Sequence, residues 1–175
     1  MKSGRAGFTW EVPADTEITG PIALRLFLEV EQAEDVYLFV GVQELRARRV
    51  VPFEGSYGYA FDRVATGWLK ASLRTADHDR SVPWSPHHTY DEILPLKEGE
   101  ISSVDIALLP SATVFRKGEQ LRLVAQGHWF STRNPLLGPF PAAYERGPWG
   151  TCVFHCGGEH AARLRIPIIQ SHTSG

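Results

Sequence analysis

The alternation of apolar and polar residues along the chain predicts β-strands and almost no helix. Its clearest stretch lies between Pro21 and Glu31, where every second residue is apolar, as in a strand with one buried face. The apolar positions are Ile22, Leu24, Leu26, Leu28 and Val30. Residues 36–43 then form a nearly continuous apolar run, which is typical of a strand covered on both faces.

Two more alternating segments lie between Gly99 and Gly127. Their apolar members are Val104, Ile106 and Leu108 in the first segment and Leu121, Leu123 and Ala125 in the second. Between the two segments, Lys117 and Gly118 are typical of a turn. The stretch therefore predicts a hairpin of two strands.

Shorter segments with the same two-residue period occur elsewhere, at residues 8–12, 45–52, 67–74, 151–156 and 160–169. The segments 75–90 and 131–150 are polar or rich in proline and glycine, and we expect two long loops there. The best helix candidate, residues 44–49, is short. Many short strands with Gly/Pro turns between them predict an all-β fold, a jelly-roll β-sandwich with little or no helix.

A chain of 175 residues, 43% of them apolar, is long enough for one domain with a full core and too short for two large ones. The strand pattern places this single domain at residues 8–170. We expect residues 1–7 to be a disordered or foreign leader and residues 171–175 to be a tail.

Charge and hydropathy narrow the range of partners. The formal net charge is −2, whereas nucleic-acid and anionic-membrane binding both need a basic field, so neither partner is expected. No apolar run approaches the roughly 18 residues of a membrane span. The first residues contain no apolar segment of a secretory signal, which favours a cytoplasmic over a secreted location.

The sequence offers no convincing catalytic serine. Serine hydrolases of the α/β type place their nucleophile in a Gly-x-Ser-x-Gly turn between a strand and a helix. The nearest stretch, from Gly55 to Gly58 around Ser56, lacks both that spacing and a following helix. We therefore interpret Ser56 as a turn residue and expect no catalytic residue in the chain.

Four possible metal ligands lie close together near the C-terminus, namely Cys152, His155, Cys156 and His160. Their spacing matches no common zinc pattern. On one strand the two cysteines would share a face and lie about 13 Å apart, at 3.3 Å per residue, which is too far for a disulfide. His155 would point to the other face of the strand. We predict two buried thiols and a strand histidine. The Asp77–Asp79 and His87–His88 stretches are interpreted as a solvated loop, and no metal or cofactor is expected.

The segment from Trp129 to Trp149 has the most unusual composition, because it combines five aromatic residues with two arginines. Long loops in compact domains are usually functional, and protein interfaces favour aromatic residues and arginine. We prefer a docking surface, and two alternatives stay open: a plug over one end of the sandwich, or a platform that stacks on sugars. The candidate interface residues are Trp84, His87, Trp129, Phe130, Arg133, Phe140, Tyr144 and Trp149.

Several segments match, in order, those of a known family: Thr16–Pro21, Asp35–Val40, Gly67–Arg74, Leu94–Glu100, Phe115–Leu123 and Arg163–Pro167. With them the chain resembles the C-terminal β-sandwich domain of the X-Pro dipeptidyl-peptidase and cocaine-esterase-like serine hydrolases, from about Phe8 to Ile169. Lys70 stands where the family usually has arginine, and Leu73 and Glu119 stand where histidine is common.

This resemblance implies a galactose-binding-like jelly roll that packs against an α/β-hydrolase catalytic domain of the same parent chain. The family's Ser-Asp-His triad belongs to that other domain, so no catalytic residue can be assigned to this chain. The implied role is to buttress the hydrolase fold and to help wall its active-site entrance. The parent would be an acyl esterase or an X-Pro dipeptidyl-peptidase, and a homo-oligomer formed through the same face is also possible.

Two other functions remain open. One is a free-standing carbohydrate-binding module, for which the aromatic residues of the 129–149 segment would stack on sugar rings. The other is an independent enzyme with a site that the sequence does not reveal.

Overall fold

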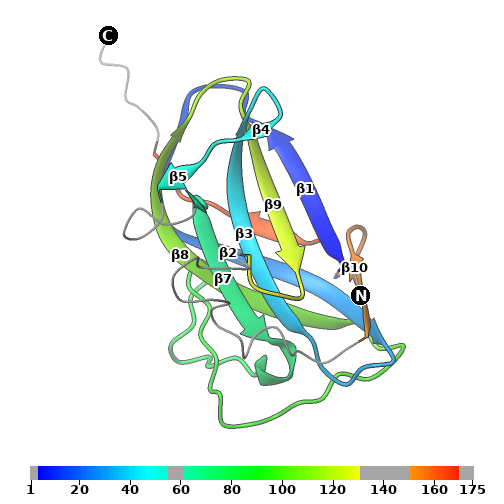
Figure 1. The fold of residues 1–175 in the computed structure, drawn as a ribbon. Helices are drawn as coiled ribbons and strands as arrows, with labels where there is room; N and C mark the ends of the chain where they lie inside the picture. The colour runs from blue at the N-terminus through cyan, green and yellow to red at the C-terminus, as the bar shows by residue number, and fades with distance from the viewer. Residues whose placement is uncertain (1–3, 55–60, 131–149, 170–175) are drawn as a thin grey trace, which may run out of the picture.

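Two antiparallel sheets face each other and enclose one apolar core (Figure 1). This computed structural model describes residues 4–54, 61–130 and 150–169. The all-β prediction is confirmed, since strands account for most of these residues and the helical content described is a single 3-10 turn, Ala71–Leu73.

Sheet A contains four main strands, in the order β1 (Arg5–Glu11), β9 (Gln120–Gln126), β3 (Tyr37–Arg46) and β7 (Ala65–Lys70). The two-residue strand β4 (Arg49–Val50) also pairs with β3. A separate small ribbon is formed by β5 (Phe53–Glu54) and β6 (Phe61–Asp62).

Sheet B is built around β2 (Thr16–Glu31), which is 16 residues long. One edge of β2 pairs with β8 (Ser102–Phe115). The other edge pairs in turn with β10 (Thr151–His155), β11 (Arg163–Arg165) and β12 (Ile168–Ile169). Four strands therefore depend on β2 for their hydrogen bonds.

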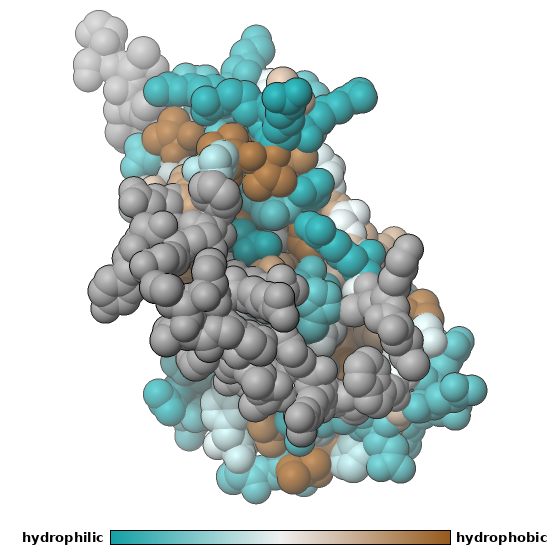
Figure 2. Space-filling model, viewed as in Figure 1, coloured by the Kyte–Doolittle hydropathy of each residue, from teal (hydrophilic) through white to brown (hydrophobic). Residues whose placement is uncertain are grey.

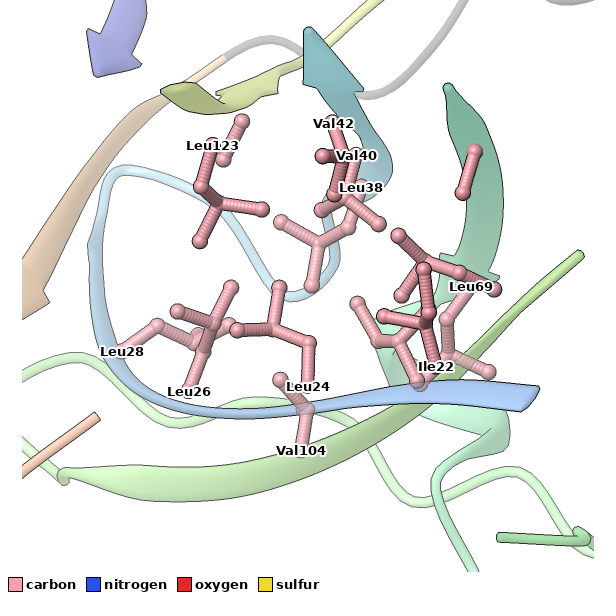
Figure 3. Close-up of a cluster of buried hydrophobic side chains, with 14 of the residues drawn as sticks. Ile22, Leu24, Leu26, Leu28, Leu38, Val40, Val42, Leu69, Val104 and Leu123 are labelled. Atoms are coloured by element: carbon pink, nitrogen blue, oxygen red, sulfur yellow. The ribbon is translucent and has the colours of Figure 1, made fainter. Parts of the chain in front are cut away.

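The core lies between the sheets and consists of the apolar residues that the alternation predicted (Figure 3). The inward side chains of β2 meet those of β3, and β7, β8 and β9 complete the cluster. Its labelled members are Ile22, Leu24, Leu26, Leu28, Leu38, Val40, Val42, Leu69, Val104 and Leu123. Each such side chain, fully buried, contributes roughly 1.5–3 kcal/mol of transfer free energy.

The predicted hairpin between Gly99 and Gly127 is wrong, although both of its strands exist. β8 pairs with β2 in sheet B, whereas β9 lies between β1 and β3 in sheet A. The turn at residues 116–119 therefore carries the chain from one sheet to the other. The period of the side chains is the same in a hairpin and at such a crossing, so the pattern could not distinguish them.

The region 44–52, for which the sequence suggested either a separate strand or a short helix, is neither of these. It is a tight hairpin in which Ala47 and Arg48 link β3 to β4 with positive φ angles of 49° and 65°. Such turns usually contain glycine or asparagine, and neither is present here. That absence explains why no hairpin signal is visible in the sequence.

The domain begins earlier than expected, because β1 starts at Arg5. Residues 5–7, part of the predicted leader, pair with Gln126, Ala125 and Val124 of β9. Near the other end, the strand predicted at 160–169 is divided into β11 and β12 around Ile166 and Pro167. The predicted tail at 171–175 lies outside the described residues.

Candidate docking surfaces

The candidate interface residues lie over two different sheets. Trp129 contacts residues of the outer face of sheet A, whereas Trp84 and His87 belong to the long connection between β7 and β8. That connection lies against the outer face of sheet B. His88 of the connection bonds to the carbonyl of Asp105 in β8, and Arg165 of β11 bonds to the carbonyl of Pro83 in the connection. The other candidates, Arg133, Phe140, Tyr144 and Trp149, lie outside the described residues. The candidates that can be placed do not share one face.

The aromatic cluster on sheet A comprises Phe39, Trp68, Trp129 and Phe130. The Trp129 ring lies edge-on to Phe39 at 5.6 Å and to Trp68 at 5.7 Å between centroids, and Phe130 follows at 6.0 Å. Phe39 and Trp68 are cross-strand partners in β3 and β7. Edge-to-face packing of this kind is favourable for aromatic rings, so Trp129 is held against its own sheet.

Within this cluster, Phe130 is held by Arg63, and a glycine leaves room for both side chains. The Arg63 guanidinium carbon lies 3.9 Å from the centre of the Phe130 ring, which is within cation–π distance. A Cβ on Gly41 would lie 2.7 Å from Cδ of Arg63 and 2.9 Å from Cζ of Phe130. The absence of a side chain at Gly41 thus makes room for both residues. Phe39 is 3% exposed and Val40 is fully buried, which confirms that β3 is covered on both faces.

The long connection, residues 74–101, runs from sheet A to sheet B and is drawn in green at the foot of Figure 1. Both ends are anchored. Asp35 accepts hydrogen bonds from the backbone N–H and the hydroxyl of Ser72, at 2.9 and 2.7 Å. The N–H of Leu94 donates to Ser72, and that of Leu96 to Glu34, at 2.8 Å each. These contacts explain why an acidic residue before β3 and the Ala-Ser pair after β7 occur together.

Four large apolar side chains of the long connection are exposed to solvent: Val82, Trp84, Tyr90 and Ile93. Trp84, 56% exposed, lies within a tight turn closed by two backbone hydrogen bonds between Val82 and Ser85. Exposed apolar groups on a fixed backbone are typical of a contact site, because little conformational freedom is lost on binding.

A polar cavity of about 460 Å³ lies between the long connection and the outer face of sheet B. Arg25 and Asp105 form a bidentate pair at its wall, with N–O distances of 2.7 and 2.6 Å. Nε2 of His88 lies 2.8 Å from the carbonyl of Asp105, and Nη1 of Arg165 donates to the carbonyl of Pro83 at 2.7 Å. The connection is thus tied to the sheet on both sides of the cavity.

Across the described ranges, the side chains form no serine triad. In these ranges, Ser85 and His87 make the one contact between a serine side chain and a histidine ring, at 3.4 Å between Oγ and Nε2, and no carboxylate binds that ring. Ser56 lies in a segment that is not described. No group of three metal-ligating side chains gathers within the described part of the chain.

The cysteine–histidine segment is placed only partly as expected. The two thiols are free, and His155 faces away from the core, where Nε2 lies 3.1 Å from a carboxylate oxygen of Glu29. Cys152 packs against the core, and its burial raises the pKa of the thiol to about 11. Cys156 is exposed, so the prediction of a second buried thiol is wrong. Cys156 follows the last residue of β10, where the alternation of a strand no longer applies.

A buried acidic pair, Glu44 and Glu119, is a feature that the sequence did not reveal. Both side chains contact Arg46, at 3.2 and 2.6 Å. Burial and the neighbouring Glu119 raise the pKa of Glu44. Burial acts in the same direction on Glu119, but the Arg116 N–H and the Arg46 guanidinium hold its pKa below the usual value. Figure 2 shows hydrophilic side chains gathered at the end of the molecule where Figure 1 places β4.

No helix among the described residues is long and apolar enough to cross a membrane.

The fold and surfaces define a β-sandwich domain with two outer faces available for contacts. A family model described as the X-Pro dipeptidyl-peptidase C-terminal non-catalytic domain matches residues 1–165. The chain belongs to this family of non-catalytic domains. No curated protein matches the chain.

Solved structures agree with this assignment. A CocE/NonD family hydrolase from Staphylococcus aureus has 30% sequence identity and a TM-score of 0.87, over 96% of this chain and 33% of that one. An aminopeptidase from a marine sediment Thaumarchaeota archaeon, at 17% identity and a TM-score of 0.62, matches over 95% of this chain and 26% of its own. An α-amino acid ester hydrolase has 16% sequence identity and a TM-score of 0.61, over 94% of this chain and 25% of its own, and likewise shares the fold. This chain therefore spans about a third or less of the hydrolases that it matches.

Proposed function

We propose that this chain is the C-terminal accessory domain of a serine hydrolase with an α/β-hydrolase catalytic domain, either an acyl esterase or an X-Pro dipeptidyl-peptidase. In this role it buttresses the catalytic domain and helps to wall the active-site entrance. The observation that carries the proposal is the match of nearly the whole chain to one third of the Staphylococcus hydrolase. The family's description as non-catalytic supports a role without chemistry of its own.

The long connection is the part of this chain best suited to contact the catalytic domain. Its apolar side chains are exposed, whereas Trp129 and Phe130 already pack on their own sheet and on Arg63. Trp84 and Ile93 are the natural contact residues, at 56% and 64% exposure. Burial of such side chains at an interface is favourable by roughly 25 cal/mol per Å² of apolar surface.

A pair of matched tryptophan variants of the parent hydrolase tests this arrangement. Trp84→Ser should lower the temperature at which the two domains separate and unfold, because an interface anchor is lost. Trp68→Ser removes a tryptophan of similar exposure, 52%, from the outer face of sheet A. It should have a much smaller effect. Calorimetry measures the unfolding temperature of each variant, and kcat/KM measures its activity.

The reverse order of the two effects would assign docking to the aromatic cluster. Equal stability and activity of both variants and the wild type would refute docking through either surface.

The non-catalytic role has its own test. This chain alone should hydrolyse p-nitrophenyl acetate no faster than a heat-treated sample. Turnover clearly above that control would contradict the proposal and favour an independent enzyme.

A carbohydrate-binding module remains the second candidate, favoured by the half-exposed Trp68 beside Trp129. Sugar platforms, however, need a free ring face, and Trp129 is already engaged by two aromatic neighbours. Glycan-array binding that disappears in Trp129→Ala, with the fold intact by circular dichroism, would favour the module over the accessory domain.

A further inference from the structure

The polar cavity beneath the long connection has an excess of positive charge. Four arginines line it: Arg25, Arg74, Arg163 and Arg165. Asp105 is the single acidic residue among the described lining residues, and Arg25 already neutralises it through the bidentate pair. Arg74 donates to the carbonyls of Ala71 and Leu94. Arg74 keeps its positive charge but is held by these carbonyls, so the arginines best placed to bind a ligand are Arg163 and Arg165.

These two arginines can still bind a ligand. Within the described residues, the side chain of Arg163 makes no hydrogen bond or ion pair. Arg165 uses one Nη1 to hold the carbonyl of Pro83, so the rest of its guanidinium donors stay available. They come from β11 with one residue between them, so both side chains stand on the outer side of sheet B. Guanidinium groups bind carboxylate and phosphate oxygens through two donors at once.

His88 helps to fix the shape of the cavity. Its side chain lines the cavity and is only 7% exposed. The carbonyl of Asp105 can only accept, so Nε2 of His88 donates to it, at 2.8 Å. This bond holds the long connection against β8 on one side of the cavity.

We propose that the cavity is a binding site for a small oxyanion, such as a carboxylate or a phosphate. The oxyanion accepts hydrogen bonds from Arg163 and Arg165. A cavity of about 460 Å³ has room for a compound of this size. The site does not depend on the proposed docking role, because all of its residues belong to this chain.

Isothermal titration with citrate and with inorganic phosphate tests the site on this chain, at an ionic strength held constant with sodium chloride. Saturable binding of one equivalent is expected for at least one of them. Arg163→Gln should weaken it about tenfold or more, since a charge-assisted bond is lost. Arg49→Gln is the matched control. It makes the same change of charge on β4, in the other sheet, and should leave the affinity unchanged.

Two results would overturn the site itself. One is the absence of saturable binding of either probe up to about 10 mM. The other is an equal loss of affinity in Arg163→Gln and Arg49→Gln, since that would indicate attraction by net charge alone. Thermal melts of both variants exclude a loss of affinity through unfolding.

Discussion

At the scale of single residues, the most informative feature is the pair of buried carboxylates. Glu44 and Glu119 share one exposed partner, Arg46, whose guanidinium contacts both of them. Ionised Glu44 is disfavoured in the folded state, so its pKa is raised, whereas that of Glu119 is lowered. The two residues should therefore affect stability in opposite directions as the pH changes.

Glu44→Gln should stabilise the protein near pH 7. A raised folded-state pKa means that ionisation above the unfolded-state pKa destabilises the fold, and this loss is absent when both states are protonated. The melting temperature should rise by roughly 2–4 °C for each kcal/mol gained, and the gain should vanish near pH 4. Calorimetry at several pH values measures it, and an unchanged or lower melting temperature at pH 7 contradicts the account.

Glu119→Gln should do the reverse. A lowered pKa contributes stability above the unfolded-state pKa, and this contribution is lost as the pH falls through the folded-state value. The variant should be less stable than the wild type at pH 7, with a difference that shrinks in acid. A deficit that stays constant with pH would show that the carboxylate charge is not responsible.

The two thiols should differ in reactivity. The thiolate is the reactive form, and a pKa of about 11 leaves Cys152 almost wholly protonated near pH 8. Cys156 is exposed. Iodoacetamide should therefore add one group to the native protein, and none to Cys156→Ser, as mass spectrometry can measure. Modification of Cys152 at a similar rate would contradict its protected state.

At the scale of the elements, the close approach of β7 to β8 depends on Gly67. A Cβ at this position would lie 2.5 Å from the carbonyl oxygen of Ala107 and 3.1 Å from Cα of Leu108. Both are backbone atoms that cannot rotate away. The glycine of the Gly67–Arg74 segment is thus explained by the distance between the two sheets.

Gly67→Ala should lower the free energy of unfolding by about 1–3 kcal/mol, the usual cost of overpacking. Gly7→Ala on β1 is the control, since its nearest neighbour would be an oxygen 3.9 Å away. It should change stability little. Urea denaturation measures both variants, and similar values for the two would refute the steric explanation.

At the scale of the whole molecule, the strands are interleaved so that neither half of the chain can complete either of the two sheets alone. Sheet A joins β1 to β9, and sheet B joins β2 to β8 and to the C-terminal strands. Unfolding should therefore be a single transition, with coincident curves from tryptophan fluorescence and far-ultraviolet circular dichroism. Two separated transitions would show that the sheets unfold independently.

The sequence predicted the strands and the core well, because burial on one face imposes a period of two that β2, β8 and β9 follow closely. It could not predict which strands pair. That choice depends on contacts between distant residues, as the pairing of Arg25 with Asp105 illustrates. The turn at Ala47 and Arg48 was missed because its positive φ angles occur without glycine.

The surfaces were predictable only in part. Composition singled out Trp84, His87, Trp129 and Phe130, but the split between two faces follows from the course of residues 74–101 across the sandwich. The arginines of the cavity come from β2, from β11 and from the start of the long connection, which are far apart in the sequence. Their convergence becomes visible only when β2 and β11 are paired.

The pairing of β2 also has a consequence for synthesis on the ribosome. One edge of this strand waits for β8, about 80 residues later, and the other for β10, β11 and β12, which are made last. Until β8 emerges, the nascent chain carries a long apolar strand with both edges open, and one edge stays open until β10, β11 and β12 follow. Ribosomes that pause before β10 should therefore hold a species with one open strand edge, which is a template for pairing with other chains.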